Sequence, residues 1–137
     1  MKQFYIDTSI WVDLYEDRIG YNGEPLGDYA LKLFYFIRSK NHSLFISDLL
    51  IKELQTLYSS EQINGLINPF LDVVVRVKSD SDSVLKAKKL SLERNIPAGD
   101  ALHALIAKKH SLTLISRDKH FKQLSDVCDC YKPEDII

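Results

Sequence analysis

Long hydrophobic runs are missing from this sequence of 137 residues. No apolar stretch approaches the roughly 18 residues that suggest a membrane-spanning helix, so we expect no membrane segment. At the amino terminus, Asp7 ends the apolar run Phe4–Ile6 too early for a secretory signal peptide. These absences predict a cytoplasmic protein, and the length predicts one domain covering residues 1–137.

Cysteine is scarce, with only Cys128 and Cys130, which are separated by one position. Neighbours this close would form a strained disulfide, and a zinc site needs about four soft or imidazole ligands. No second cysteine pair or nearby histidine supplies them. We therefore predict buried, reduced thiols and no requirement for an oxidising compartment.

A basic excess is also missing. The chain has 18 Lys and Arg against 19 Asp and Glu, a net charge of −1, which is not typical of a nucleic-acid-binding protein. If four acids are committed to a metal, 15 acidic residues remain against 18 basic ones, a balance of +3. That balance permits binding to a polyanion without proving it.

Short apolar runs alternate with helical patterns along most of the chain. The predicted strands are Phe4–Ile6, Leu44–Ile46, Val73–Val77, Leu112–Ile115 and, from a weaker pattern, Val127–Tyr131. The predicted helices are Leu26–Ser39, Asp48–Tyr58, Ser83–Arg94 and Pro97–His110. Strands without clear polar alternation are typical of a sheet buried on both faces, and their alternation with helices favours βαβ units. The pattern predicts an α/β fold with a parallel sheet.

Capping and turn residues set the expected boundaries. Ser47 is placed to cap the helix that begins at Asp48, and Pro97 occupies an expected first helical position. The segment Glu16–Asp28 contains three glycines and a proline, which predicts an irregular loop. No repeat, low-complexity tract or interdomain linker is evident.

Two aspartates follow predicted strands. Asp7 ends the first strand, and Asp118 comes just after the strand Leu112–Ile115. Ligands of parallel α/β sheets gather at the carboxyl ends of strands, so both positions favour a functional site. Each aspartate is also placed to cap a following helix, and for each residue alone this structural interpretation is equally well supported.

Two further acids lie on predicted helices. Glu53 lies beside the apolar stripe of Leu49 and Leu57, where a carboxylate needs a cation or strong hydrogen-bond donors. A salt bridge at the rim of the core is the structural alternative. Asp100 lies in the first turn of a helix that is apolar nearly all round, which predicts burial. Its alternative role is to interact with the helix dipole alone.

Together these four acids predict a metal site. Carboxylates that converge on one pocket raise each other's pKa unless a cation neutralises them. Ligand sets of oxygen alone select hard ions such as Mg²⁺ or Mn²⁺, which can polarise a phosphoryl oxygen and activate a bound water. The predicted metal ligands and catalytic residues are Asp7, Glu53, Asp100 and Asp118.

The same acids lie in motifs that resemble the PIN-domain nucleases. The matching pieces are Tyr5–Ser9, Ser47–Leu54, Gly99–Ala104 and Leu114–Phe121, which span almost the whole chain in the family's order. Each motif is degenerate alone, whereas the ordered set is fairly specific. The length also resembles that of the single-domain toxins of type II toxin–antitoxin pairs.

The resemblance implies a Rossmann-like parallel sheet flanked by helices, and Mg²⁺- or Mn²⁺-dependent cleavage of single-stranded or structured RNA. Position by position, the family's acidic metal site falls on Asp7, Glu53, Asp100 and Asp118. Thr8 or Ser9 matches the small hydroxyl residue that steadies the carboxylates. Many members carry another acid two positions beyond the last aspartate, where this chain has His120. A toxin implies an antitoxin partner, which we expect to insert a basic side chain into the acidic pocket.

Basic side chains beside Asp118 offer contacts for RNA. Arg117, Lys119 and His120 are placed to meet substrate phosphates, although a solvated basic turn explains each of them equally well. His103 lacks a carboxylate at a suitable sequence spacing, so packing or hydrogen bonding is favoured over a role as a zinc ligand.

A homodimer is expected from the first long helix. Its apolar side chains offer more surface than one helix face needs, and a two-fold dimer is the default form of self-association. The residues concerned are Leu33, Phe34, Phe36 and Ile37.

The leading hypothesis is a metal-dependent endoribonuclease, with the toxin of a toxin–antitoxin pair as one physiological role. The alternative is a catalytically inactive PIN-like module that binds RNA or protein, and the presence of all four acids argues against it. A phosphatase with Asp7 as nucleophile would need a second aspartate two residues later, where Ser9 stands.

Overall fold

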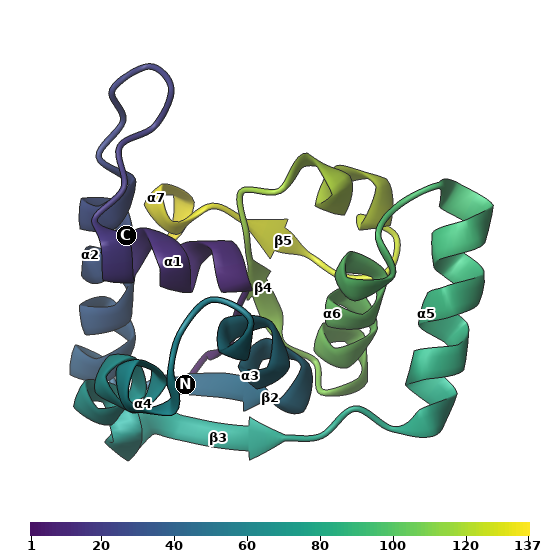
Figure 1. The fold of residues 1–137 in the computed structure, drawn as a ribbon, viewed down its shortest axis with the longest axis horizontal. Helices are drawn as coiled ribbons and strands as arrows, with labels where there is room; N and C mark the ends of the chain where they lie inside the picture. Colours follow the sequence, from purple (N-terminus) through teal and green to yellow (C-terminus); the bar gives the residue numbers. More distant parts are fainter.

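The computed structural model describes residues 1–137, which form a five-stranded, wholly parallel sheet with helices on both faces (Figure 1). The strands are β1 (Gln3–Ile6), β2 (Ser43–Ser47), β3 (Val74–Val77), β4 (Thr113–Ile115) and β5 (Cys130–Tyr131). The helices are α1 (Thr8–Glu16), α2 (Leu26–Ser39), α3 (Asp48–Gln55), α4 (Ser60–Ile67), α5 (Ser81–Arg94), α6 (Ala98–Lys109) and α7 (Pro133–Ile136). Two 3₁₀ helices complete the chain, η1 (Asn68–Val73) and η2 (Lys119–Leu124). The predicted α/β fold is confirmed.

The central strand β1 is buried on both faces, as its apolar sequence predicts. Phe4 and Ile6 point into one core, which they share with α1, α2, α3 and α4. Tyr5 points into the opposite core, which it shares with α5 and α6. Figure 1 shows α2 and α4 on one side of the sheet and α5 and α6 on the other. Parallel sheets require this covering because both of their faces are apolar.

The strand order β3-β2-β1-β4-β5 places a topological switch point beside β1. The chain runs outward from β1 through β2 to β3, and then returns through α5 and α6 to the other side of β1 as β4. Ile6 at the end of β1 is paired with Ile115 at the end of β4. The residues that follow these two strands therefore meet where open α/β sheets bind ligands.

Several predicted boundaries are confirmed and two are corrected. The bounds of α2 match the prediction, and the Ser47 hydroxyl caps α3 by accepting a hydrogen bond from the amide of Leu50. The predicted helix Asp48–Tyr58 is too long, because α3 ends at Gln55 and Ser59 starts α4 with a capping box. Pro97 is the N-cap of α6 rather than its first helical residue.

The carboxyl-terminal strand is shorter than predicted. The amides of Val127 and Cys128 both bond to the carbonyl of Leu124 in a turn, so only Cys130 and Tyr131 pair with β4. Both cysteines are free, with Cys128 buried and Cys130 half-buried. Burial raises the pKa of the two thiols to about 11 and about 12, respectively, which keeps them protonated.

The apolar side chains that prompted the homodimer prediction belong mostly to the core of one chain. Leu33, Phe34 and Ile37 are fully buried, and the ring of Phe34 lies 4.5 Å from that of Trp11 between centroids. The argument from excess apolar surface is therefore wrong for these three residues. Leu31 and Tyr35 are the large apolar side chains that α2 leaves exposed, and the dimer itself stays a prediction.

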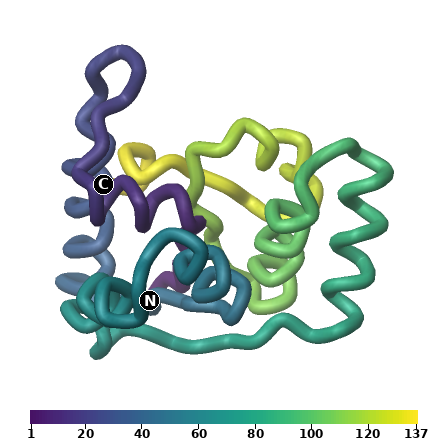
Figure 2. The backbone as a smooth tube through the Cα atoms, viewed as in Figure 1, coloured from purple at the N-terminus to yellow at the C-terminus, as the bar shows by residue number.

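A loop between α1 and α2 stands out from the body of the molecule (Figure 2). Its base is closed by a hydrogen bond of 3.0 Å from the amide of Gly27 to the carbonyl of Arg18. Asp17 enters the loop in the left-handed conformation, and a Cβ on Gly27 would lie only 2.6 Å from the Cα of Asp17. The loop predicted at Glu16–Asp28 is confirmed in its central part. None of the helices has the length and apolar character needed to span a bilayer.

Candidate active site

The first acid of the site, Asp7, extends from the carboxyl end of β1. Its amide continues the sheet by donating to the carbonyl of Ile115, and its carboxylate is buried. The hydroxyls of Ser9 and Ser116 donate to Asp7 Oδ2 over 2.9 and 2.8 Å. Asp7 occupies the N-cap position of α1, but its side chain makes no capping hydrogen bond. The structural interpretation of Asp7 as a helix cap is therefore wrong.

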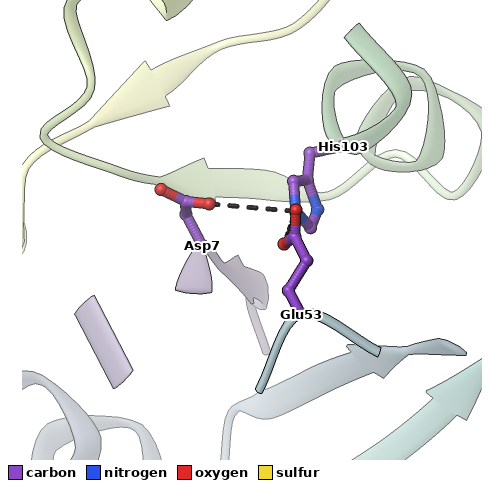
Figure 3. A group of neighbouring side chains, drawn as sticks. All are labelled: Asp7, Glu53 and His103. Atoms are coloured by element: carbon purple, nitrogen blue, oxygen red, sulfur yellow. Dashed lines mark hydrogen bonds and ion pairs between the residues drawn. The ribbon is translucent and has the colours of Figure 1, made fainter. Parts of the chain in front are cut away.

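Glu53 reaches the site from α3. The Thr8 hydroxyl lies 2.5 Å from Glu53 Oε1, and His103 Nε2 lies 2.6 Å from the same oxygen. His103 Nε2 is also 3.8 Å from Asp7 Oδ1, so the imidazole lies between two carboxylates (Figure 3). Burial alone would raise the pKa of Glu53, but the hydrogen bonds and charge of its partners hold that pKa below its usual value. Glu53 is therefore ionised at neutral pH.

A buried hydrogen-bond chain orients His103. Because the Glu53 carboxylate can only accept, His103 Nε2–H is the donor between them. His103 Nδ1 lies 2.6 Å from the Tyr5 hydroxyl, and Tyr5 in turn lies 2.6 Å from Ser47 Oγ. Burial raises the pKa of Tyr5 far above its usual range, so the phenol keeps its proton. The expectation that His103 is engaged in packing and hydrogen bonding is confirmed.

Asp100, Asp118 and His120 form a second group beside the first. Asp100 extends from the first turn of α6, and Asp118 follows β4. His120 Nδ1 lies 3.1 Å from Asp100 Oδ2 and 2.8 Å from Asp118 Oδ1. Asp118 Oδ1 also accepts from the amide of His120 and so caps η2. The capping interpretation of Asp118 is confirmed, and it does not remove the carboxylate from the site.

The two groups belong to one electrostatic cluster. Burial raises the pKa of Asp100 to about 6, and the negative charges of Asp118 and Asp7 add to the shift. A Cβ on Gly99 would lie 3.2 Å from Glu53 Oε2, which places the Glu53 carboxylate against the start of α6. The structure therefore brings together all four of the predicted acids, from α3, α6 and the ends of β1 and β4.

The donor set fits a hard divalent cation. In each of the two groups, the possible ligand atoms lie within 4.8 Å of one another. Asp100 Oδ2 is buried and accepts no hydrogen bond in spite of its nearness to His120, and a buried acceptor of this kind needs a compensating partner. His103 uses both ring nitrogens in hydrogen bonds, so in the first group the carboxylate oxygens are the atoms left to bind an ion. In the second group, His120 Nδ1 also lacks a hydrogen bond.

The three residues predicted to contact RNA differ in whether their side chains already have partners within the chain. Arg117 donates two hydrogen bonds, of 2.8 and 2.7 Å, to the carboxylate of Glu134 and thereby ties the segment after β4 to α7. Lys119 is exposed, makes no ion pair and lines a cavity of about 530 Å³ that also includes Asp118. His120 faces the acids as described. Lys119 is thus the side chain of the three that is free to meet a phosphate.

Comparison with protein families identifies the architecture. The family model described as PIN domain matches residues 4–127, which is most of the chain. The chain belongs to the PIN-domain family. The parallel sheet flanked by helices that the resemblance implied is observed.

Solved structures of similar PIN folds are distant in sequence. Toxin VapC20 from Mycobacterium tuberculosis, described as cleaving the sarcin–ricin loop, has a TM-score of 0.66 and 20% identity and covers 88% of this chain and 94% of its own. VapBC2 from Rickettsia felis, bound to a DNA fragment from its promoter, has a TM-score of 0.65 and 20% identity over 93% and 96% of the two chains. FitAcB from Neisseria gonorrhoeae has a TM-score of 0.59 and 17% identity over 96% and 98%. No match emerged among curated protein sequences. At these identities the structures show a shared fold.

Three side chains of this PIN domain that support the acids, Ser116, Tyr5 and His103, were missed by sequence reasoning. Ser116, which donates to Asp7, had a usable signal, because it follows β4 directly just as Asp7 follows β1. Tyr5 had none, because its partners Ser47 and His103 lie 42 and 98 positions away in the chain.

Proposed function

We propose that this PIN domain is a divalent-metal-dependent endoribonuclease that hydrolyses RNA phosphodiester bonds at Asp7, Glu53, Asp100 and Asp118. The observation that carries the proposal is Asp100, a half-buried carboxyl with a raised pKa and a buried oxygen without a hydrogen bond, beside further acids. Such a cluster is costly without a cation. Residues 1–137 would then act as one catalytic unit.

Mg²⁺ or Mn²⁺, when bound, supplies a Lewis acid for the phosphoryl oxygen and an activated water. The protein's own contribution is to hold the carboxylates in place. Ser9 and Ser116 fix Asp7, whereas Thr8 and His103 fix Glu53. Hydroxyl and imidazole donors on the ligating carboxylates are the usual outer support of metal sites.

The substrate side of the site favours a polyanion. The cavity of about 530 Å³ beside Asp118 is lined by Lys119, Lys122 and Lys132, all exposed and without ion pairs, and also by the acids Asp129 and Asp135. Its volume is in the range of small-ligand sites, so it can receive a nucleotide adjoining the cleaved phosphate. Lys119 would contact that phosphate directly, with His120 as a second candidate contact.

The test is cleavage of a generic single-stranded RNA by purified protein with Mn²⁺ or Mg²⁺ and with EDTA. We expect cleavage with metal, loss of cleavage in EDTA, and no cleavage by Asp100→Asn. Undiminished cleavage in EDTA would contradict a metal-dependent mechanism. Binding of RNA without metal-dependent cleavage would instead identify an inactive PIN-like binding module.

A toxin role would add two partners. Because relatives include VapC and Fit proteins, we infer that an antitoxin covers the site and places a basic side chain among the acids. A small DNA-binding protein encoded beside this gene would support that role. A homodimer is also expected, and sedimentation at tens of micromolar tests it.

A further inference from the structure

A groove separate from the acidic cluster lies beside α3, along the carboxyl ends of β2 and β3. Its volume is about 420 Å³, and its apolar walls include Ile46, Ile51 and Val77. Three basic side chains line it, Lys52 from α3 and Arg76 and Lys78 from β3 and the residue after it. Of these three cations only Lys52 lies within a quoted sequence motif, Ser47–Leu54, and none of them was predicted to bind a ligand.

The three cations of this basic groove have no partner within the chain. All are exposed, and none takes part in an ion pair. Asp48 is the one acid in the lining, and its carboxylate is turned to the amide and hydroxyl of Ser79, over distances of 2.8 to 3.1 Å. Three positive charges thus face one engaged negative charge. Clustered like charges do not stabilise a fold, so this groove favours an anionic ligand.

The position of the groove connects it to the acidic cluster. Ser47 lines the groove and also contacts Tyr5, which is linked through His103 to Glu53. Lys52 directly precedes Glu53 on α3. β3 lies two strands from β1 in the sheet, about 10 Å at the usual strand spacing. A nucleic-acid strand held at the acids can therefore extend over α3 to these cations.

We propose that the basic groove binds backbone phosphates of the RNA substrate on the β3 side of the cleavage site. The proposal rests on the proposed function and deepens it. Arg76 offers a planar fork that matches a phosphate, and the two lysines add point charges. No aromatic side chain lines the groove, so it has no platform for stacking bases. The groove therefore raises affinity for RNA without selecting its sequence.

The test compares two double variants that each remove two unpaired cations. Arg76→Gln with Lys78→Gln alters the groove, and Lys32→Gln with Lys88→Gln is the matched control on α2 and α5, where both lysines are exposed and unpaired. Each pair is placed in the Asp100→Asn background, and binding of a fluorescent single-stranded RNA is measured by anisotropy at several salt concentrations. Arg76→Lys with Lys78→Arg preserves the charge and guards against a folding defect.

We expect the groove variant to bind RNA more weakly than the protein with an intact groove, whatever the sequence of the RNA. Its plot of log affinity against log salt should be shallower by about 1.4, because each phosphate contact on a single strand contributes about 0.7. The control and the charge-preserving variant should keep the original slope. An unchanged slope in the groove variant, or equal losses in groove and control variants, would overturn the proposal.

Cleavage by the unmodified chain separates this proposal from the proposed function. If wild-type protein cuts RNA with Mn²⁺ but the groove variant binds RNA normally, the groove assignment fails and the function stands. If RNA binds through the groove but is never cut, the groove stands and the nuclease proposal fails.

Discussion

At the scale of single residues, Asp100 has the clearest energetic signature. Its carboxyl has a pKa of about 6 in the folded chain, against about 3.9 in an unfolded one. The folded state holds the proton more tightly, so the stability associated with this group is complete below about pH 4 and is lost as the pH rises through about 6. Its side chain is largely shielded from solvent, so the penalty at neutral pH is on the order of 1–3 kcal/mol.

Asp100→Asn removes that charge at nearly constant shape. We expect the metal-free variant to be at least as stable as wild type at neutral pH. Its free energy of unfolding should also fall less than that of wild type between about pH 4 and about pH 7. Denaturant unfolding at both pH values measures this. A drop in stability at neutral pH would show that Asp100 serves the fold instead.

The pKa of Asp48 is shifted in the opposite direction to that of Asp100. Burial alone would raise its pKa, but hydrogen bonds from Ser79 hold that pKa below its usual value. The stability that the lowered pKa of Asp48 contributes is present above the pKa of the unfolded chain. It is lost as the pH falls through the pKa of the folded chain. Asp48→Asn should therefore destabilise the chain at neutral pH in the same experiment.

His103 is predicted to position Glu53. His103→Leu removes both of its hydrogen bonds, so Glu53 loses its buried donor and we expect Mn²⁺ affinity to fall by about 10- to 100-fold. Tyr5→Phe removes only the hydroxyl that orients the ring and should have a smaller effect. Calorimetric titration with Mn²⁺ measures both. Wild-type affinity in His103→Leu would contradict the positioning role.

At the scale of elements, periodicity and capping residues were sufficient for the long segments. Leu26–Ser39 was predicted with its observed bounds because its apolar stripe is regular and lies between turn residues. The short helix α4 was missed, although Ser59 and Gln62 form a capping box that signals it. The length of β5 was not predictable, because a turn at Leu124 decides where pairing with β4 begins.

The acids of the site could be predicted because they follow strands or interrupt apolar helix faces. Among the supporting groups, Thr8 and Ser9 could also be predicted, because they follow Asp7 directly. Tyr5 and His103 could not, because they look like ordinary core residues and are joined only by the fold. The same limit applied to α2. This helix does carry more apolar side chains than one face needs, but they pack into the core, where the ring of Phe34 contacts both Trp11 and Phe70.

The start of α2 gives a prediction about the protruding loop. Gly27→Ala would place a methyl group 2.6 Å from the Cα of Asp17, so backbone must move and we expect a loss of about 1–3 kcal/mol. Gly65 in α4 is the matched control, since a Cβ there meets nothing within 4 Å. Gly65→Ala should stabilise by about 0.5–1 kcal/mol. Thermal melts that rank the two alanine variants in the reverse order would contradict this account.

At the scale of the whole molecule, metal binding should be visible as stability. An ion that binds only the folded chain raises the free energy of unfolding by about 2.7 kcal/mol at a hundred times its dissociation constant. We expect Mn²⁺ to raise the melting temperature, EDTA to reverse the increase, and Asp100→Asn to reduce it. A melting temperature that does not change when Mn²⁺ is added would count against the metal site.

The strand order has a consequence for how the protein is made. β1 leaves the ribosome before the other strands, yet one of its two neighbours, β4, begins more than a hundred residues later, so its pairing has high contact order. A nascent chain that ends before α6 carries Asp7 and Glu53 but neither Asp100 nor Asp118. Under the proposed function, the nuclease centre is therefore assembled only after α6 and the residues that follow β4 have been synthesised. The topology itself delays any activity against the RNA of the translation machinery until these later elements have been made.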